Sequence, residues 1–183
     1  VYPDAKNPGV YALWMTQAGL SMPSRDYYLK EDEKFANFRA ALKQYASDLV
    51  AAAGQKRAAE IAENVLMIET KLAELQWDRV ASRDAEKTYN KMSQKQLSEL
   101  LGAFNWKAYG GSTGYADAES VIVRMPSFFE GLGKFYGESD LRAWKDYFQF
   151  KMVDAYAGRL SNEFGDLRFG FYSKTLRGQE EQQ

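Results

Sequence analysis

Apolar residues recur at intervals of three and four over two long segments of this chain, which predicts two amphipathic α-helices. In the segment from Asp32 to Ala53 these positions are Phe35, Phe38, Leu42, Tyr45 and Leu49. In the segment from Lys56 to about Trp77 they are Ile61, Val65, Ile68, Leu72 and Leu75. Gly54 supplies a C-terminal cap for the first helix. The connection is so short that the pattern predicts an antiparallel helical hairpin.

Shorter helices are expected further along the chain. Ser93 followed by Gln96 is a capping-box pattern, which predicts a short helix through Leu97, Leu100 and Leu101 that ends at Gly102. Ser139 is the expected N-cap of a long helix that ends near Gly158 and carries, on one face, Leu141, Trp144, Phe148 and Met152. A last helix with Phe164, Leu167 and Phe171 is weakened by Gly165 and Gly170.

Two apolar segments are rich in β-branched residues and could pair as a small two-stranded sheet. They are Val10 to Gln17 and Val121 to Val123, the second of which is stopped by Pro126. Gly110 to Gly114 should be a mobile loop that separates two lobes of one helical domain, residues 1–183, and the tail from Gly178 to Gln183 looks frayed. The expected fold is therefore mainly α.

Composition narrows the functional classes. The 183 residues are 45% hydrophobic, which is enough to bury one core, and the net charge of -1 offers no global field for nucleic acid or an anionic membrane. No apolar run approaches the ~20 residues that span a bilayer. We therefore expect no nucleic acid partner and no membrane contact by this segment.

The chain contains no histidine and no cysteine, and this excludes most conventional active sites. It has no Ser-His-Asp triad, no Cys-His pair and none of the soft ligands of zinc, copper, haem or iron–sulfur sites. The glycine-rich GGSTG string at 110–114 is not followed by a lysine, so it is not a phosphate-binding loop. The sequence predicts no catalytic residue and no metal ligand.

Aromatic residues make up 15% of the chain and allow two interpretations. Clusters such as Tyr27-Tyr28, Phe128-Phe129 and Trp144-Tyr147-Phe148-Phe150 could line a chamber for peptide or sugar, but aromatic residues at helical spacing are usually core. Carboxylate pairs offer no better site, because the default for all of them is a solvated surface: Asp32-Glu33, Asp117/Glu119 and Glu180-Glu181.

Several strings resemble one protein family. The run from Gln17 to Leu29, QAGLSMPSRDYYL, is similar to the Q-G-G-L-G-L-P-D-R-D-Y-Y signature in the non-catalytic part of the neprilysin and endothelin-converting-enzyme family of zinc metallopeptidases, which includes the bacterial oligopeptidase O group. Residues 68–93, IETKLAELQWDRVASRDAEKTYNKMS, resemble that family's E-x-x-L-A and R-D-x-x-x-T-Y-N-K-M segments. The resemblance covers nearly the whole chain through four further strings: FNWKAY, VIVRMPSFFEGL, LRAWKDYFQFKMVDAYAGRLS and FGFYSKTLRGQEEQ.

The resemblance implies a position within a larger enzyme. In that family an H-E-x-x-H helix and a downstream Glu bind zinc in the later part of the protein, and none of these residues is present here. The chain is then a fragment of the N-terminal non-catalytic region, with zinc expected only in the full-length parent. The catalytic domain of the same polypeptide and the parent's peptide substrates are the implied partners. An extracytoplasmic location, in a bacterial periplasm or cell envelope, is implied as well.

The charged residues of the two strongest motifs are given structural roles. Gly19 and Pro23 bracket a turn, which an Arg25–Asp26 ion pair could pin beneath the hairpin, so Arg25→Ala is expected to lower the melting temperature. Further along, Asp84 is expected to cap a short turn, Arg83 to satisfy carbonyls or a carboxylate, and Asn90 to bond the backbone locally.

Two functions remain open at this point. The first is a non-catalytic helical lid of a zinc metalloendopeptidase that encloses the substrate chamber and restricts it to short peptides. The alternative is an independent helical module that binds a protein or peptide through exposed aromatic residues. No substrate-binding residue can be assigned for either function.

Overall fold

The computed structural model describes residues 1–180 and divides into two compact units. We call residues 1–18 and 75–139 the sheet unit, and residues 19–74 and 140–180 the helical unit. The chain therefore passes from the sheet unit into the helical unit, back again, and once more into the helical unit. Each unit is described by itself below.

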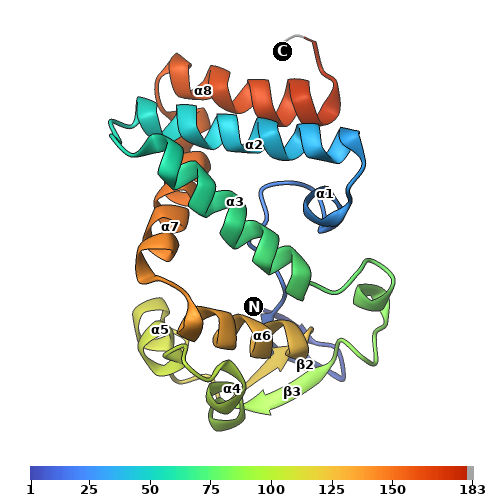
Figure 1. Ribbon diagram of the computed structural model, residues 1–183. Helices are drawn as coiled ribbons and strands as arrows, with labels where there is room; N and C mark the ends of the chain where they lie inside the picture. The colour runs from blue at the N-terminus through green and yellow to red at the C-terminus, as the bar shows by residue number, and fades with distance from the viewer. Residues whose placement is uncertain (181–183) are drawn as a thin grey trace. The chain divides into compact units, whose positions relative to one another are not determined.

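The helical unit is built on long amphipathic helices. Its elements are α1 (Asp26–Leu29), α2 (Glu33–Ala52), α3 (Ala58–Leu75), α7 (Leu141–Tyr156), the 3₁₀ turn η2 (Ala157–Arg159), α8 (Asn162–Phe169) and the π-helical η3 (Gly170–Thr175). Figure 1 shows α8 side by side with α2. The core is formed by the apolar stripes of these helices and includes Leu42, Leu49, Ile61, Val65 and Phe150.

The two long helices predicted from periodicity are confirmed, and so is the turn between them. Gly54 has a φ of 82°, and the Gln55 amide donates to the Val50 carbonyl at 3.0 Å, which closes the end of α2 in the glycine-dependent manner expected. The two helices diverge from this turn (Figure 1), so α2 lies mainly against α7 and α8 instead of along the whole of α3.

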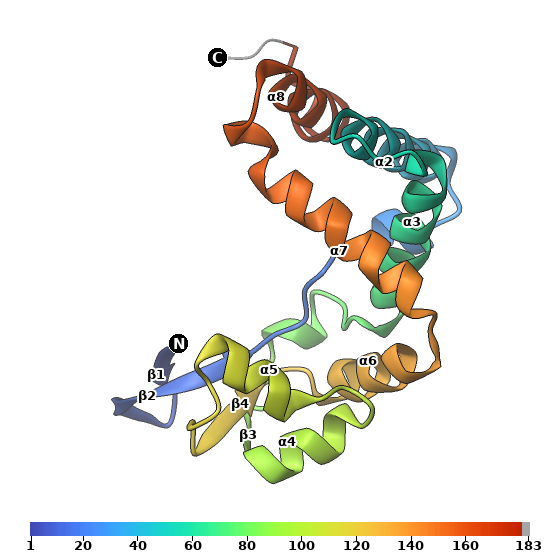
Figure 2. The same cartoon turned by 90° about the vertical axis from the view of Figure 1, so that its left-hand side faces the viewer.

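The sheet unit contains a four-stranded sheet and three helices. Its elements are β1 (Tyr2–Asp4), β2 (Asn7–Met15), η1 (Ala81–Arg83), β3 (Asn90–Ser93), α4 (Gln94–Leu101), α5 (Trp106–Thr113), β4 (Ser120–Val123) and α6 (Pro126–Glu138). The strand order is β1-β2-β4-β3, as Figure 2 shows. Its core lies under β4 and the first turn of α6, where the buried side chains are Val121, Ile122, Val123, Met125, Phe128 and Phe129.

The predicted pairing of the two β-branched segments is confirmed, and two further strands extend the sheet. Leu13 lies opposite Val121 and Met15 opposite Val123 in a parallel pair. The sequence analysis missed β1, which pairs antiparallel with β2, and β3, which pairs antiparallel with β4. Both missed strands have four residues or fewer, which is too short for a clear period-two pattern.

The capping box is confirmed at the start of α4. The Ser93 hydroxyl accepts a hydrogen bond from the Gln96 amide, while the Gln96 side chain accepts one from the Ser93 amide. Gly102, at φ 52°, ends the helix. The N-terminus of α4 was predictable because Ser93 and Gln96, the two partners of the capping box, lie within four residues of each other.

The mobile loop predicted at 110–114 was wrong, because this segment is the second half of α5 and its cap. The Asn105 side chain accepts from the Ala108 amide at 3.0 Å and starts the helix, and Gly114 ends it at φ 77°. A Cβ on Gly110 would lie 3.4 Å from the Ala116 backbone, so this glycine permits a close return of the chain. The segment lies inside the sheet unit and separates no lobes.

The predicted N-cap of α7 was also wrong. Its N-cap is Asp140, whose carboxylate accepts from the Arg142 amide at 2.9 Å, while Ser139 ends α6 and donates to the Phe135 carbonyl. Of the four side chains predicted to share one face, only Trp144 is buried, and the other three are more than half exposed: Leu141, Phe148 and Met152. The buried face instead carries Ala143, Trp144, Asp146, Tyr147, Phe150 and Asp154.

The predicted last helix is present despite its glycines. It runs as α8 through Phe169 and continues as the π-helical η3, with Phe171 buried against Tyr45. Of the tail predicted to be frayed, residues 178–180 carry no helix or strand, and residues 181–183 lie outside the described part of the chain.

Candidate binding pocket

The glycine of the QAGLSMPSRDYYL string marks a close approach between backbone and side chains. Gly19 has a φ of 104°, a Cβ at this position would lie 2.7 Å from Leu72 Cδ1, and its carbonyl accepts from the Tyr147 hydroxyl at 2.7 Å. Any larger residue would be strained here and would also collide with α3. The string therefore needs glycine for packing.

A buried carboxylate, Glu69 of α3, holds the rest of this string. It is fully buried and accepts from the Ser21 amide at 2.9 Å, from the Ser21 hydroxyl at 2.7 Å and from the Tyr28 hydroxyl. Lys151 Nζ lies 3.4 Å from the same carboxylate. Burial, followed by the neighbouring Glu69 charge, raises the pKa of the Tyr28 phenol above its ordinary value. The Glu69 carboxylate is thus paired with a cation, and both of its oxygens accept hydrogen bonds.

A second buried carboxylate, Asp154 of α7, joins three helical segments. It accepts from the Tyr45 hydroxyl at 2.6 Å and from the Tyr172 hydroxyl at 2.9 Å, and Arg168 Nη1 lies 3.2 Å away. Burial and then the charge of Asp154 raise the pKa of both phenols. Both oxygens of Asp154 therefore accept hydrogen bonds from side chains of this unit, and the carboxylate ties α7 to α2, α8 and η3.

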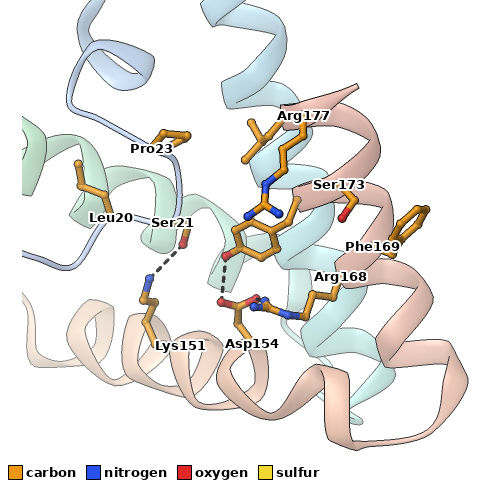
Figure 3. A pocket seen from close by; sticks show the side chains of 11 residues that line it. Leu20, Ser21, Pro23, Lys151, Asp154, Arg168, Phe169, Ser173 and Arg177 are labelled. Carbon is orange, nitrogen blue, oxygen red and sulfur yellow. Dashed lines mark hydrogen bonds and ion pairs between the residues drawn. The ribbon is translucent and has the colours of Figure 1, made fainter. Parts of the chain in front are cut away.

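A pocket of about 700 Å³ opens beside these two carboxylates, within the helical unit. Figure 3 shows Lys151 and Asp154 of α7 on one side and Arg168 and Arg177 on the other, with Leu20 and Pro23 of the motif string at the rim. Lys151 Nζ donates to the Ser21 hydroxyl at 3.1 Å. The pocket is therefore a cleft with cationic walls and an apolar rim.

The described residues, 1–180, contain no group of three carboxylates that could hold a metal ion. The sequence also has no histidine or cysteine, which are the commonest zinc ligands in proteins.

The ion pair predicted between Arg25 and Asp26 was wrong. Asp26 pairs instead with Lys30, one helical turn away, at 3.1 Å, and the turn is held by Tyr28 and Glu69. Neighbouring residues on a helix do not face each other, so Asp26 is directed toward Lys30.

Two of the three predictions around Arg83 are confirmed. Asp84 accepts from the Glu86 and Lys87 amides at 3.1 Å each and caps the turn, as expected. The Asn90 side chain donates through Nδ2 to the Lys87 carbonyl at 2.7 Å and also to the Val123 carbonyl of the neighbouring strand. For Arg83 no side-chain partner emerges among residues 1–180, so its predicted role stays a prediction.

Most of the aromatic clusters belong to the core, as the helical spacing indicated. The buried members are Tyr28, Phe128, Phe129, Trp144, Tyr147 and Phe150, while Tyr27 is partly buried and Phe148 is exposed. The carboxylates of Asp32, Glu33, Asp117, Glu119 and Glu180 are exposed, and Glu181 lies outside the described residues. None of these groups lines the pocket.

Sequence reasoning missed Glu69 and Asp154, although a signal was present. Glu69 lies four residues after Val65 and three before Leu72, so it falls on the apolar face of α3. Asp154 stands in the same relation to Phe150 on α7. A carboxylate on a core face must be paired, and that requirement could have prompted a search for its partners.

Comparisons with known proteins agree on one family. A family model described as Peptidase family M13 matches residues 1–183. Human endothelin-converting enzyme 1 is 26% identical over 176 residues, which is 91% of this chain and 22% of that protein. Mouse endothelin-converting enzyme-like 1 is 23% identical over 167 residues, which is 88% of this chain and 21% of that protein.

Solved structures of a zinc metalloprotease, Zmp1 of Mycobacterium tuberculosis, share the fold. The open state superimposes with a TM-score of 0.87 at 26% identity, over 93% of this chain and 27% of the Zmp1 chain. The inhibitor complex gives a TM-score of 0.84 at the same identity, over 93% of this chain and 26% of the other. The present chain thus spans about a fifth to a quarter of the length of these relatives.

Proposed function

The chain belongs to peptidase family M13, and we propose that it is a non-catalytic part of a zinc metalloendopeptidase that helps to enclose the substrate chamber. The observation that carries this proposal is the match of the family model to all 183 residues of a chain without a single histidine or cysteine. A zinc peptidase needs protein ligands for its metal, so these would come from another part of the polypeptide. The contribution of this chain is then shape.

The buried polar clusters support a scaffolding role. Glu69 and Asp154 each tie together segments that are distant in the sequence, and both oxygens of each carboxylate accept hydrogen bonds inside the fold. Active-site carboxylates, in contrast, keep a lone pair or a proton for the substrate. These two buried carboxylates are therefore committed to holding helices together.

An exposed apolar stripe on α7 supports a contact with the rest of such a polypeptide. Its members, each more than half exposed, are Leu141, Phe148, Met152 and Tyr156. Clustered exposed apolar side chains commonly mark an interface. In the proposed parent, the catalytic part of the same polypeptide would be the partner, and short peptides would be the substrates. An independent interaction module would use the same stripe, which keeps that alternative open.

The family resemblance also leads us to propose an extracytoplasmic location for the parent protein. Within residues 1–180, each helix is too short or too polar to cross a membrane. If the parent is anchored, we propose that another segment carries the anchor.

Substrate size tests the enclosing role in the M13 protein that carries this chain. The same cleavable sequence would be presented twice, once as a free fluorogenic peptide and once as an exposed loop of a folded carrier protein. Enclosure predicts that the free peptide is cleaved at least about a hundredfold faster, because the carrier is too large for the chamber. Equal kcat/KM values for the two substrates would contradict the proposal.

A further inference from the structure

The pocket of the helical unit carries more positive charge than its carboxylates can neutralise. Its walls hold Lys151, Arg168 and Arg177 but only one acid, Asp154. Asp154 already accepts from two tyrosine hydroxyls as well as Arg168, and Glu69, behind Lys151, accepts from Ser21 and Tyr28. The cations therefore retain donors that the two acids cannot use.

Of the three cations that line the pocket, Arg177 is the most available to bind an anion. It is exposed, and in the part of the chain from residue 1 to residue 180 no carboxylate forms an ion pair with it. Figure 3 shows its side chain directed into the space above Asp154 and Arg168. A guanidinium has five donors in a planar fork that matches the two oxygens of a carboxylate or phosphate. Arg177 is thus placed to receive an anion.

The rest of the pocket suggests what the anion is attached to. Leu20, Pro23, Phe169 and Leu176 supply apolar surface next to the cations, and the volume of about 700 Å³ falls within the roughly 300–1,000 Å³ typical of small-molecule sites. A free inorganic anion would leave the apolar part unused. A peptide with an acidic group beside an apolar side chain would fill both parts.

We propose that this pocket binds a carboxylate of an acidic peptide, with Arg177 as the principal contact and with Lys151 and Arg168 as supporting cations. The adjoining side chain of the peptide packs against Leu20 and Leu176. Binding at this site does not require that the chain be part of an enclosure. A failure here would therefore leave the enclosing role untouched, and the reverse also holds.

Isothermal titration of the 183-residue chain with two matched peptides tests the proposal. One hexapeptide has a glutamate next to a leucine near an amidated end, and the other replaces that glutamate with glutamine. We expect measurable binding of the glutamate peptide and at least about tenfold weaker binding of its isostere, since the charge-assisted hydrogen bonds are lost. Equal affinities, or no binding of the glutamate peptide at millimolar concentration, would overturn the proposal.

Matched arginine variants locate the site. Arg177→Gln is expected to weaken binding of the glutamate peptide about tenfold, whereas Arg159→Gln removes the same charge from another exposed arginine that does not line the pocket. If the two variants lost affinity equally, the effect would be one of net charge and the assignment would fail. A third titration uses inorganic phosphate as the ligand. If phosphate bound as tightly as the glutamate peptide, the pocket would be a simple anion site, and the proposed packing of a peptide side chain against its apolar residues would be wrong.

Discussion

The Tyr28 hydroxyl donates a hydrogen bond to the buried carboxylate of Glu69, a residue 41 positions away in the sequence. The same carboxylate accepts from both the amide and the hydroxyl of Ser21. The QAGLSMPSRDYYL string is thereby fixed to α3 by a single acidic side chain. This arrangement gives the string a structural explanation that requires no catalytic role.

Glu69→Gln is expected to lower the free energy of unfolding by about 3 kcal/mol. The amide NH₂ cannot accept the hydrogen bonds that one carboxylate oxygen now receives, and Lys151 loses its countercharge. Urea denaturation at neutral pH measures the change. Glu74→Gln is the matched control on the same helix. Glu74 is exposed and pairs with Lys71, so its substitution should lower the free energy of unfolding by less than about 1 kcal/mol. If both variants lost a similar free energy of unfolding, the hydrogen bonds of Glu69 would not be important for stability.

Two phenylalanines of α7 test which face of that helix is buried. Phe150 is fully buried and Phe148 is 56% exposed. Phe150→Ala should cost about 3–5 kcal/mol through lost burial and a cavity, while Phe148→Ala should cost about 1 kcal/mol or less. Thermal or urea unfolding of the two variants gives the comparison. The reverse order would mean that the face assignment is wrong.

Two helical glycines should respond in opposite ways to alanine. A Cβ on Gly133 of α6 would lie 2.1 Å from the Leu101 carbonyl oxygen, so Gly133→Ala must push two backbones apart and should cost at least about 2 kcal/mol. Gly165 of α8 has open space at this position, and Gly165→Ala should stabilise the chain by about 0.5–1 kcal/mol through helix propensity. Melting temperatures that move in the same direction for both variants would argue against the α4–α6 contact.

Acid stability should depend on Asp4 in the sheet unit. Hydrogen bonds from the Lys6 amide, Lys91 and Tyr89 lower the pKa of this carboxyl from 3.8 to about 2. A lowered folded-state pKa stabilises the fold above the unfolded value, and this stabilisation is lost as the pH falls from about 4 toward 2. Unfolding curves from pH 7 to 2 should therefore show a smaller decline for Asp4→Asn than for the unmodified chain. Asp117→Asn, on an exposed residue, should decline in parallel with the unmodified chain, and an Asp4→Asn curve that does so too would refute the role of Asp4.

Features that depend on neighbouring residues were predictable from the sequence. The capping box at Ser93, the turn at Gly54 and the core stripes of α2 and α3 all follow from spacings of a few residues. The face of α7 was not predictable in this way, because apolar residues occur around most of that helix. The orientation of α7 depends on two buried carboxylates. Asp146 is paired with Arg57 from the turn after α2, and Asp154 accepts a hydrogen bond from Tyr45 of α2.

The binding pocket depends on tertiary placement even more strongly. The pocket is lined by residues from distant parts of the sequence: Ser21 lies well over a hundred positions before both Lys151 and Arg177. No local pattern joins these residues. The motif strings revealed the family, whereas the walls of the pocket emerged only from the packing of α7 against α3 and the C-terminal helices. The prediction that no residue is catalytic or metal-binding remains a prediction.

Zinc content, measured together with peptide hydrolysis on the same purified chain, tests the central claim most directly. After zinc loading and dialysis, elemental analysis should find less than about a tenth of an equivalent per chain, because a stable structural or catalytic zinc site needs three or four protein ligands of suitable type. The same sample should release no product from a fluorogenic peptide. One tightly held zinc per chain, or hydrolysis that a chelator abolishes, would contradict the claim that this part of the M13 protein is non-catalytic.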